Sequence, residues 1–358
     1  MGWQATRGRG EILGHDAVIE QLVRAAAHGR IAGSYLFVGP SGVGKGTVAL
    51  ALAKSLLCER PRPGLVACGG CASCVQADGG SHPDIDVVSR PPDRASIPLE
   101  ALIGSAEHRM REGLCWRLLL RPALGGRRVA IILDADHLSD EAANCLLKTL
   151  EEPPDRAVII LVGTAVERQL PTILSRCRIV RFRPLDEESV CRILRAEAAA
   201  GDAAADDAAI RRAAAAAGGS LTRARLLLDP NLTAFHDTLQ ATLAARPLRG
   251  VELARETIAF VEAAGKEAPA RRARARVAFE AAIDVCRTGL RRAVTGAGPQ
   301  DADRARHADA WAAHEEEALR AIQASIDALD AIDRNANLTI LIDAWTARLE
   351  AATATRRS

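Results

Sequence analysis

A short apolar run that leads into a glycine-rich loop, and then into a helix-forming stretch, constrains this chain more than any other feature. The run at 35–38 is strand-like, the loop Gly-Pro-Ser-Gly-Val-Gly-Lys fills 39–45, and the helix-forming stretch covers 47–57. In such a loop, consecutive backbone N–H groups surround a phosphate, and the following helix adds the positive end of its dipole. The pattern predicts a parallel α/β domain that binds nucleotide phosphates; a glycine-rich turn without a ligand is the alternative.

The predicted nucleotide-binding residues lie in this loop and at the start of the next helix. They are Gly39, Pro40, Ser41, Gly42, Val43, Gly44, Lys45, Gly46 and Thr47. A catalytic loop of this type needs Ser or Thr directly after the lysine to hold Mg²⁺, whereas here Gly46 stands there and the hydroxyl comes one residue later, on Thr47. One residue rotates a helical side chain by about 100°. We therefore expect ATP to bind mainly through the backbone, with Mg²⁺ poorly positioned.

A second apolar run, at 129–133, ends in a carboxylate, Asp134. At the carboxyl end of a buried strand such an aspartate faces the metal ion of a bound nucleotide; a structural carboxylate at a helix end is the alternative. In the AAA+ ATPases that this pattern resembles, a glutamate base follows the aspartate, but here the residue is Ala135, and we expect Asp136 to face elsewhere. Because a catalytic base typically contributes about 10²–10⁴-fold, the domain is predicted to be a poor ATPase.

Four cysteines are closely spaced just after the predicted helix. They are Cys58, Cys68, Cys71 and Cys74. Four thiolates at this density match a tetrahedral structural Zn²⁺ site with no open position for water, and a short loop with few apolar residues needs such a site to fold. His82 is an alternative ligand, although a structural role is favoured. The other cysteines are interpreted as small apolar core residues: Cys115, Cys145, Cys177, Cys191 and Cys286.

The composition excludes some functional classes. The formal net charge of +2 is too small for a strongly basic nucleic-acid binder. No apolar stretch approaches the ~20 residues that span a bilayer, and the first ten residues lack the apolar core of a secretory signal. We expect a cytoplasmic protein without membrane contact. One basic stretch is interpreted as a solvated helix face, with DNA contact as the alternative: Arg271, Arg272, Arg274 and Arg276.

The pattern along the chain predicts three domains. Residues 1–182 alternate short apolar runs with helical stretches, as expected for a parallel sheet covered by helices, and carry the zinc module at 58–74. Residues 183–230 are predicted to form a small helical domain that begins with Asp186 as a helix N-cap. Residues 231–358 show only helical patterns.

Two longer motifs bring in a known family. Residues 146–154 read Leu-Leu-Lys-Thr-Leu-Glu-Glu-Pro-Pro, and residues 170–177 read Leu-Pro-Thr-Ile-Leu-Ser-Arg-Cys. Both resemble motifs of the clamp-loader subunits of bacterial DNA polymerase III, which are AAA+ proteins. Three shorter motifs also fit: Gly14-His15-Asp16, His82-Pro83-Asp84 and Arg334-Asn335-Ala336-Asn337-Leu338. The resemblance covers most of residues 10–230 and weakens beyond them.

The resemblance implies a fold and three residue roles. The fold is a RecA-like sheet domain with a zinc insertion, a small helical lid and a C-terminal helical collar. Arg176 would reach the γ-phosphate of ATP on a neighbouring subunit, an ordinary ion-paired arginine being the alternative. Thr164 falls at a nucleotide-sensing position, where a strand-end hydroxyl with a local hydrogen bond is the alternative. Thr222 stands where the lid normally supplies an arginine, with Arg223 one step further round the helix.

Within this family the chain resembles the delta-prime subunits more than the gamma/tau subunits. Gamma/tau subunits keep Ser or Thr after the loop lysine and an Asp-Glu pair, whereas this chain has Gly46 and Ala135. The implied partners are gamma/tau and delta subunits in a hetero-pentamer, with the sliding clamp and primed DNA contacted through the complex. An active gamma/tau-type ATPase and a structural module that binds no nucleotide are the alternatives.

Overall fold

The computed structural model describes residues 12–91, 94, 96–109, 111–124, 126–200, 206–296, 302–334 and 336–354. The described residues up to Leu228 form one compact unit, and those from Asp229 onward form a second. Asn335, which belongs to a motif discussed above, lies outside the described residues.

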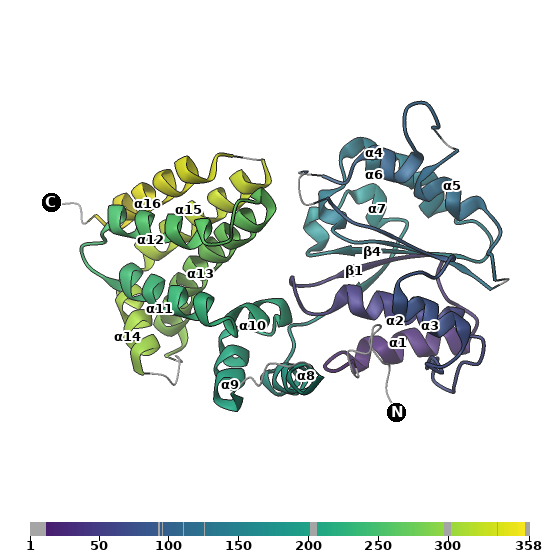
Figure 1. Ribbon diagram of the computed structural model, residues 1–358, viewed down its shortest axis with the longest axis horizontal. Coiled ribbons are helices and arrows are strands. Elements are labelled where there is room, and N and C mark those ends of the chain that lie inside the picture. Colours follow the sequence, from purple (N-terminus) through teal and green to yellow (C-terminus); the bar gives the residue numbers. More distant parts are fainter. Residues whose placement is uncertain are drawn as a thin grey trace. The chain divides into compact units, whose positions relative to one another are not determined.

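The first unit is built on a five-stranded sheet (Figure 1). The strands are β1 (Ser34–Val38), β2 (Ile85–Val88), β3 (Arg128–Ile132), β4 (Ala157–Gly163) and β5 (Arg178–Arg181). Their spatial order is β2-β3-β4-β1-β5, and every pairing is parallel. β1 therefore lies between two strands that are distant in sequence, with Leu36 opposite Leu161 on one side and Ile179 on the other.

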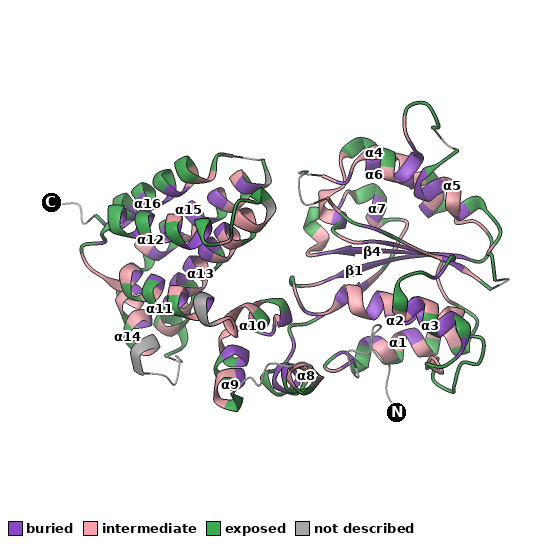
Figure 2. Ribbon diagram, viewed as in Figure 1, coloured by how far each residue is buried: buried purple, intermediate pink, exposed green. Residues whose placement is uncertain are grey.

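Strand residues alternate between two apolar cores, one on each face of the sheet. On one face, Tyr35 and Phe37 pack with helices α1 (Asp16–Ala27) and α2 (Lys45–Leu57). On the other face, Leu36 and Val38 pack in a core that includes residues of the helices α4 to α7. Strands β1, β3 and β4 are buried along their whole length because helices cover both faces (Figure 2), as is usual for parallel sheets.

The helices of the second face are short, except one. They are α4 (Leu99–Ile103), α5 (Gly113–Leu119), α6 (Asp140–Glu151) and α7 (Pro171–Leu174), with 3₁₀ turns at Ala135–His137 and Val166–Arg168. Ser139 caps α6, since its hydroxyl accepts from the backbone N–H of Ala142. The remaining helix of the sheet region, α3 (Ala72–Gly79), follows the cysteine-rich loop.

Three helices complete the first unit around a small core of their own. They are α8 (Glu187–Ala200), α9 (Asp207–Ala216) and α10 (Leu221–Leu227). Asp186 accepts a hydrogen bond from the backbone N–H of Ser189 at 2.8 Å, so it caps α8 as the sequence predicted. The core of these helices includes Val190, Ile210 and Ala224.

The second unit is entirely helical in its described residues. Its helices are α11 (Pro230–Ala244), α12 (Gly250–Glu262), α13 (Ala268–Thr295), α14 (Ala302–Ala312), α15 (Glu315–Asp333) and α16 (Leu338–Thr353). Asn337 caps α16 with its side-chain oxygen, which gives the last of the short motifs a structural role. None of the described helices combines the length and the apolar character that crossing a membrane requires.

The basic stretch at the start of α13 was predicted to form a solvated face, and its arginines are partly exposed. Arg274 lies over the ring of Phe260 and donates to its carbonyl oxygen at 2.9 Å, and Arg271 donates to the carbonyl of Gly265. Arg271 and Arg274 therefore also make contacts within the unit.

The all-parallel sheet, with a glycine-rich loop after β1, agrees with the RecA-like domain that the resemblance implied. The predicted fold class, an α/β sheet domain followed by helices only, is confirmed. Four strands were found from apolar runs, at 35–38, 129–133, 158–162 and 179–182. No apolar run predicted β2, which is a four-residue edge strand with a charged Asp86 inside it.

Candidate functional site

The glycine-rich loop connects the carboxyl end of β1 to the first residue of α2, which is Lys45. Gly42 and Gly44 have φ angles of 78° and 98°, which residues with a Cβ rarely adopt. The left-handed turn at Gly44, the N-cap of α2, brings the loop to the helix N-terminus. The backbone therefore has the form that a phosphate cradle needs.

Lys45 is buried and folds back over its own loop. Its Nζ donates to the carbonyl oxygens of Gly39 at 2.6 Å and Pro40 at 2.7 Å. Burial lowers the pKa of Lys45 to about 8, while the carboxylates of Asp136 and Asp134 act in the opposite direction. In this arrangement the ammonium is bound to the loop itself and would have to turn to reach a phosphate.

The group of helices α8 to α10, which we call the lid, touches the same loop. The backbone N–H of Leu221 donates to the carbonyl of Gly42 at 2.8 Å. A Cβ built on Gly42 would lie 2.2 Å from Ser220 Oγ and 3.0 Å from Thr222, so only glycine fits beneath the lid. Thr222, at the position where the resemblance places an arginine, thus lies against the loop with a side chain too short to span a phosphate group.

His15 holds the loop from the opposite side. Its Nε2 lies 2.7 Å from the carbonyl oxygen of Val43, and its ring packs edge-on against Phe182 with centroids 4.9 Å apart. Burial lowers the pKa of His15, which favours the neutral ring at this contact. The first short motif of the sequence therefore has a definite place, as a support for the loop.

The acidic residues after β3 lie on either side of Ala135. Asp134 is exposed and has a left-handed φ of 56°. Ala135 is buried in the core beneath α6, where a glutamate would displace apolar packing. Asp136, which was expected to face elsewhere, binds Thr164 and Gln169 with its two carboxylate oxygens. The 3₁₀ turn at Ala135–His137 follows directly after Asp134 and places Asp136 at these partners.

Thr164, which follows β4, is bound to Asp136. Its hydroxyl donates to Asp136 Oδ2 at 2.6 Å, and its backbone N–H donates to the same oxygen at 2.7 Å. A Cβ on Gly163 would lie 2.7 Å from the other oxygen of Asp136, so this glycine permits the close approach. The family resemblance pointed to Thr164, but no pattern in the sequence indicated that Asp136 is its partner or that Gly163 makes room for the contact.

Arg176 lies between α7 and β5, and its side chain is 28% exposed. Its Nη2 and Nε both donate to Oε2 of Glu151, at 3.0 and 3.2 Å. Its Nη1 donates to the carbonyl of Thr172 and to the hydroxyl of Ser175, both at 3.1 Å. Glu151 is the last residue of α6, so the two longest family-like motifs of the sequence meet in this ion pair.

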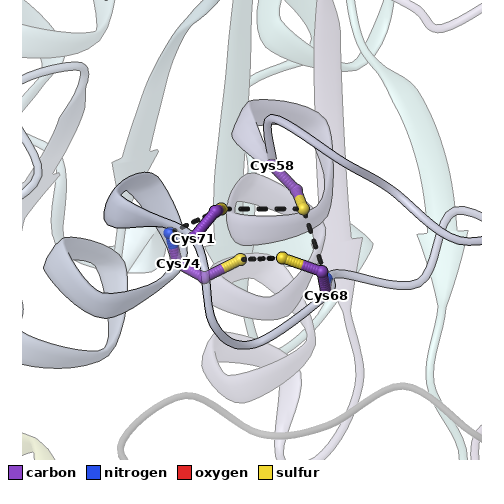
Figure 3. Close-up of side chains that lie close together, drawn as sticks. All are labelled: Cys58, Cys68, Cys71 and Cys74. Carbon is purple, nitrogen blue, oxygen red and sulfur yellow. Dashed lines mark hydrogen bonds between the residues drawn. The ribbon is translucent and has the colours of Figure 1, made fainter.

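The four predicted metal ligands come together at the other end of α2 (Figure 3). Cys58 follows α2, Cys68 lies in the loop, and Cys71 and Cys74 lie at the start of α3. Their sulfur atoms all lie within 4.8 Å of one another, with 3.9 Å between Cys58 and Cys71 and 4.0 Å between Cys68 and Cys74. Tetrahedral zinc with Zn–S bonds of about 2.3 Å sets sulfur–sulfur distances of about 3.8 Å, so the donor set fits Zn²⁺.

The cysteine cluster also has the electrostatic surroundings of a metal site. The backbone N–H of Cys68 donates to the sulfur of Cys58 at 3.2 Å, and that of Cys74 donates to the sulfur of Cys71. A backbone hydrogen bond at Gly70 is the main cause that lowers the pKa of the Cys68 thiol to about 6. Burial raises the pKa of Cys58 and of Cys74, and a bound cation would oppose this cost of ionising them.

Side chains of the cysteine module bind α2 directly. Lys54, on α2, donates to both carboxylate oxygens of Asp78 on α3 at 2.7 Å. Ser73 donates its hydroxyl to the carbonyl of Leu57 at 2.7 Å and contacts His82 Nε2 at 3.0 Å. His82 also accepts from the backbone N–H of Asp84, so its ring serves the fold and lies outside the metal cluster.

Comparison with known proteins finds similarity to DNA polymerase III subunits in the first half of the chain. The family model described as DNA polymerase III, delta subunit, matches residues 14–186. A DNA polymerase III subunit delta' from Pseudomonas aeruginosa is 38% identical over 161 residues, which are 45% of each chain. The Bacillus subtilis subunit delta' is 34% identical over 173 residues, 48% of this chain and 49% of that protein.

A subunit of another name matches over a similar length. The DNA polymerase III subunit tau of Escherichia coli is 34% identical over 182 residues, 50% of this chain and 26% of that protein. The chain thus spans about half the length, or less, of the curated relatives that it matches. A gamma subunit-related protein of Thermotoga maritima superimposes over 93% of this chain and 99% of its own, with 17% identity and a TM-score of 0.42, and no assignment rests on that likeness.

Proposed function

We propose that the chain is an accessory clamp-loader subunit of the DNA polymerase III delta-prime type that supplies Arg176 to a neighbouring ATPase, because residues 14–186 match the family model and the curated subunits delta' are similar to it. Its proposed partners are gamma/tau and delta subunits, with the sliding clamp and primed DNA contacted through the complex. In this role the chain hydrolyses little or no ATP itself.

The observation that carries the proposal is a phosphate loop that keeps its backbone form without the side chains of a catalytic site. Gly46 offers no hydroxyl for Mg²⁺, and Ala135 is packed in the core where an ATPase would present a base. Thr222 lies at the lid position of an arginine and is too short for that role. Three losses at one site favour an accessory subunit over a motor.

Arg176 is the residue that could still take part in hydrolysis, on a neighbour's nucleotide. A guanidinium brought to the γ-phosphate stabilises the charge that develops in the transition state, and such arginines contribute about 10³–10⁵ in NTPases generally. Arg176 lies in the segment between α7 and β5, partly exposed, on the first unit. That position supports a contact made with another subunit.

We assign a structural role to the cysteine cluster in the same proposal. Cys58, Cys68, Cys71 and Cys74 would hold one Zn²⁺, which would fold the loop between α2 and α3. Four thiolates leave no coordination position for a reacting water. The metal would therefore support the end of α2 and take no part in ATP hydrolysis.

The experiment is reconstitution with gamma/tau and delta chains, followed by a clamp- and DNA-stimulated ATPase assay. Arg176→Ala is expected to lower turnover at the ATPase site that this arginine serves by about 10³-fold or more. The ATPase rate of the whole complex should therefore fall by the fraction that this one site contributes. Arg168→Ala, which changes an exposed arginine in the same region, is the matched control and is expected to keep the wild-type rate. An unchanged rate for Arg176→Ala would remove the proposed role.

Two rival functions are separated by measurements on the isolated chain. A gamma/tau-type ATPase would turn over ATP without partners, and Lys45→Ala would abolish that turnover. A module without any nucleotide is favoured by one observation, namely that Lys45 and the lid already bind the carbonyls of the loop. Equilibrium binding of ATP with and without Mg²⁺ distinguishes the second rival, since our proposal expects weak binding with little dependence on Mg²⁺.

A further inference from the structure

The guanidinium of Arg176 is almost fully engaged within its own chain. An arginine side chain has five N–H donors, and four of them make hydrogen bonds here. Two go to Glu151, one to the carbonyl of Thr172 and one to the hydroxyl of Ser175. A single N–H remains to meet a phosphate, so the side chain as it stands is held back from a role on another subunit.

Glu151 contributes the one negative charge of this arrangement. The Glu151 side chain is 60% exposed and that of Arg176 is 28% exposed. Exposed ion pairs are weak and are screened by salt. A triphosphate carries more charge than a carboxylate and accepts the same fork-shaped pattern of donors. The pair therefore has the properties of a contact that holds Arg176 when no better anion is near and yields when one arrives.

We propose that Glu151 is a latch that restrains Arg176 until the nucleotide of a neighbouring subunit displaces it. The inference rests on the proposed role of Arg176 and adds its regulation. While the latch is closed, the carboxylate neutralises the charge that would stabilise the transition state. Closure thus lowers the rate of hydrolysis on the neighbour before clamp and DNA have completed the assembly.

The strength of an exposed ion pair sets the size of the effect. Such pairs change an equilibrium by roughly 1.5- to 5-fold. Removing the negative charge by Glu151→Gln should increase the released fraction of Arg176 by about this factor. Glu152→Gln is the matched control, because Glu152 is the adjacent glutamate and is also exposed.

The first test uses the isolated chain and phenylglyoxal, with modification of Arg176 followed by peptide mass spectrometry. Phenylglyoxal reacts at the guanidinium nitrogens, and Glu151 occupies two of them while the latch is closed, so the latch protects Arg176. Glu151→Gln is expected to speed modification of Arg176 by about 1.5- to 5-fold, whereas Glu152→Gln keeps the wild-type rate. Equal rates in all three proteins would overturn the latch.

The second test uses the reconstituted complex without clamp or DNA. Glu151→Gln is expected to raise its ATPase rate by up to about fivefold. Added salt screens the ion pair and is therefore expected to raise the wild-type rate. This increase should be absent in Glu151→Gln. A lower or unchanged rate would overturn the proposal, because Glu151 would then position Arg176 or do nothing.

Failure of the proposed function gives a different result. In that case Arg176→Ala leaves the ATPase rate of the complex unchanged, while protection of Arg176 from phenylglyoxal by Glu151 still appears in the isolated chain. The latch alone fails if Arg176→Ala lowers the rate of the complex and Glu151→Gln does not raise it.

Discussion

The two ends of helix α2 carry two candidate ligand sites that differ in which groups would hold the ligand. At the N-terminal end, the loop that leads into Lys45 has the backbone of a phosphate site, while Gly46 provides no metal ligand. At the C-terminal end, Cys58 and three further cysteines place all their sulfur atoms within 4.8 Å of one another. The same helix thus connects a loop whose backbone N–H groups could bind a phosphate to a cluster whose cysteine sulfurs could bind a metal.

Under the proposed function, the difference indicates which kind of site can remain without catalysis. Backbone donors are fixed by φ and ψ, and a loop packed between His15 and the lid keeps its form whether or not a nucleotide is cleaved there. A metal site of thiolates depends on every ligand, since each cysteine supplies one quarter of the shell. The loop at the start of α2 therefore has a structural role that does not depend on catalysis.

The largest expected effect is at the cysteine end. Cys74→Ser removes a fully buried ligand and should lower zinc affinity by more than about 100-fold, because even changes behind the ligands cost 10- to 100-fold. Elemental analysis after dialysis against a chelator measures it. Cys145→Ser, outside the cluster, should keep one zinc per chain. Equal metal content in the two variants would contradict a zinc site and break the comparison.

The next effect is at the loop end and depends on pH. Lys45 has a folded-state pKa of about 8 against an ordinary value of 10.5. The folded state therefore loses this proton first, and the free energy of unfolding should rise as pH increases from about 8 to 10.5, by at most about 3 kcal/mol. Urea unfolding across this range, wild type against Lys45→Met, isolates the contribution. A pH dependence equal in the two proteins would show that Lys45 is not buried as a charge.

A smaller effect concerns the lid on the loop. Gly42→Ala places a Cβ against Ser220 and Thr222, whereas Gly29→Ala, also at a left-handed φ, meets nothing within 4 Å. Both variants carry the backbone strain, so their difference reports the lid contact alone. Gly42→Ala should lose about 1–3 kcal/mol more than Gly29→Ala in the free energy of unfolding. Equal losses would indicate that the lid is not seated on the loop in solution.

The smallest effect tests the attachment of the cysteine module to α2. Ser73→Ala removes the hydrogen bond to the carbonyl of Leu57 and should cost about 1 kcal/mol of unfolding free energy. Ser41→Ala, an exposed serine in the loop at the other end of α2, should stay within about 0.5 kcal/mol of the wild type. Thermal unfolding of the two variants gives the comparison, and a larger loss at Ser41 would reverse it.

Much of the architecture could be predicted because its signals are local. Apolar runs of strand length located β1, β3, β4 and β5, and the cap at Asp186 located the start of α8. The cysteine spacing was sufficient to predict that the four sulfur atoms converge. Edge strand β2 was missed because it is short and carries Asp86, which pairs with Arg117 from a neighbouring helix rather than with solvent.

The site was harder to predict because its contacts join distant segments. The two hydrogen bonds from Arg176 to Glu151 connect residues 25 positions apart, and Thr164 meets Asp136 across 28. A motif can suggest that such residues matter, but only the folded chain shows which of them are partners. The burial of Ala135 likewise depends on α6 folding back over the 3₁₀ turn.

The position of β1 in the sheet has a consequence for synthesis on the ribosome. Its two hydrogen-bonded neighbours, β4 and β5, begin at Ala157 and Arg178, so more than a hundred residues must be made before either edge of β1 is covered. The four cysteines of the cluster have all been synthesised by residue 74, and bringing them together requires only contacts that are local in sequence. During translation the cysteine-rich loop can therefore fold first. The apolar strand β1 stays exposed until β4 and β5 have been made. In this interval the nascent chain is prone to aggregation.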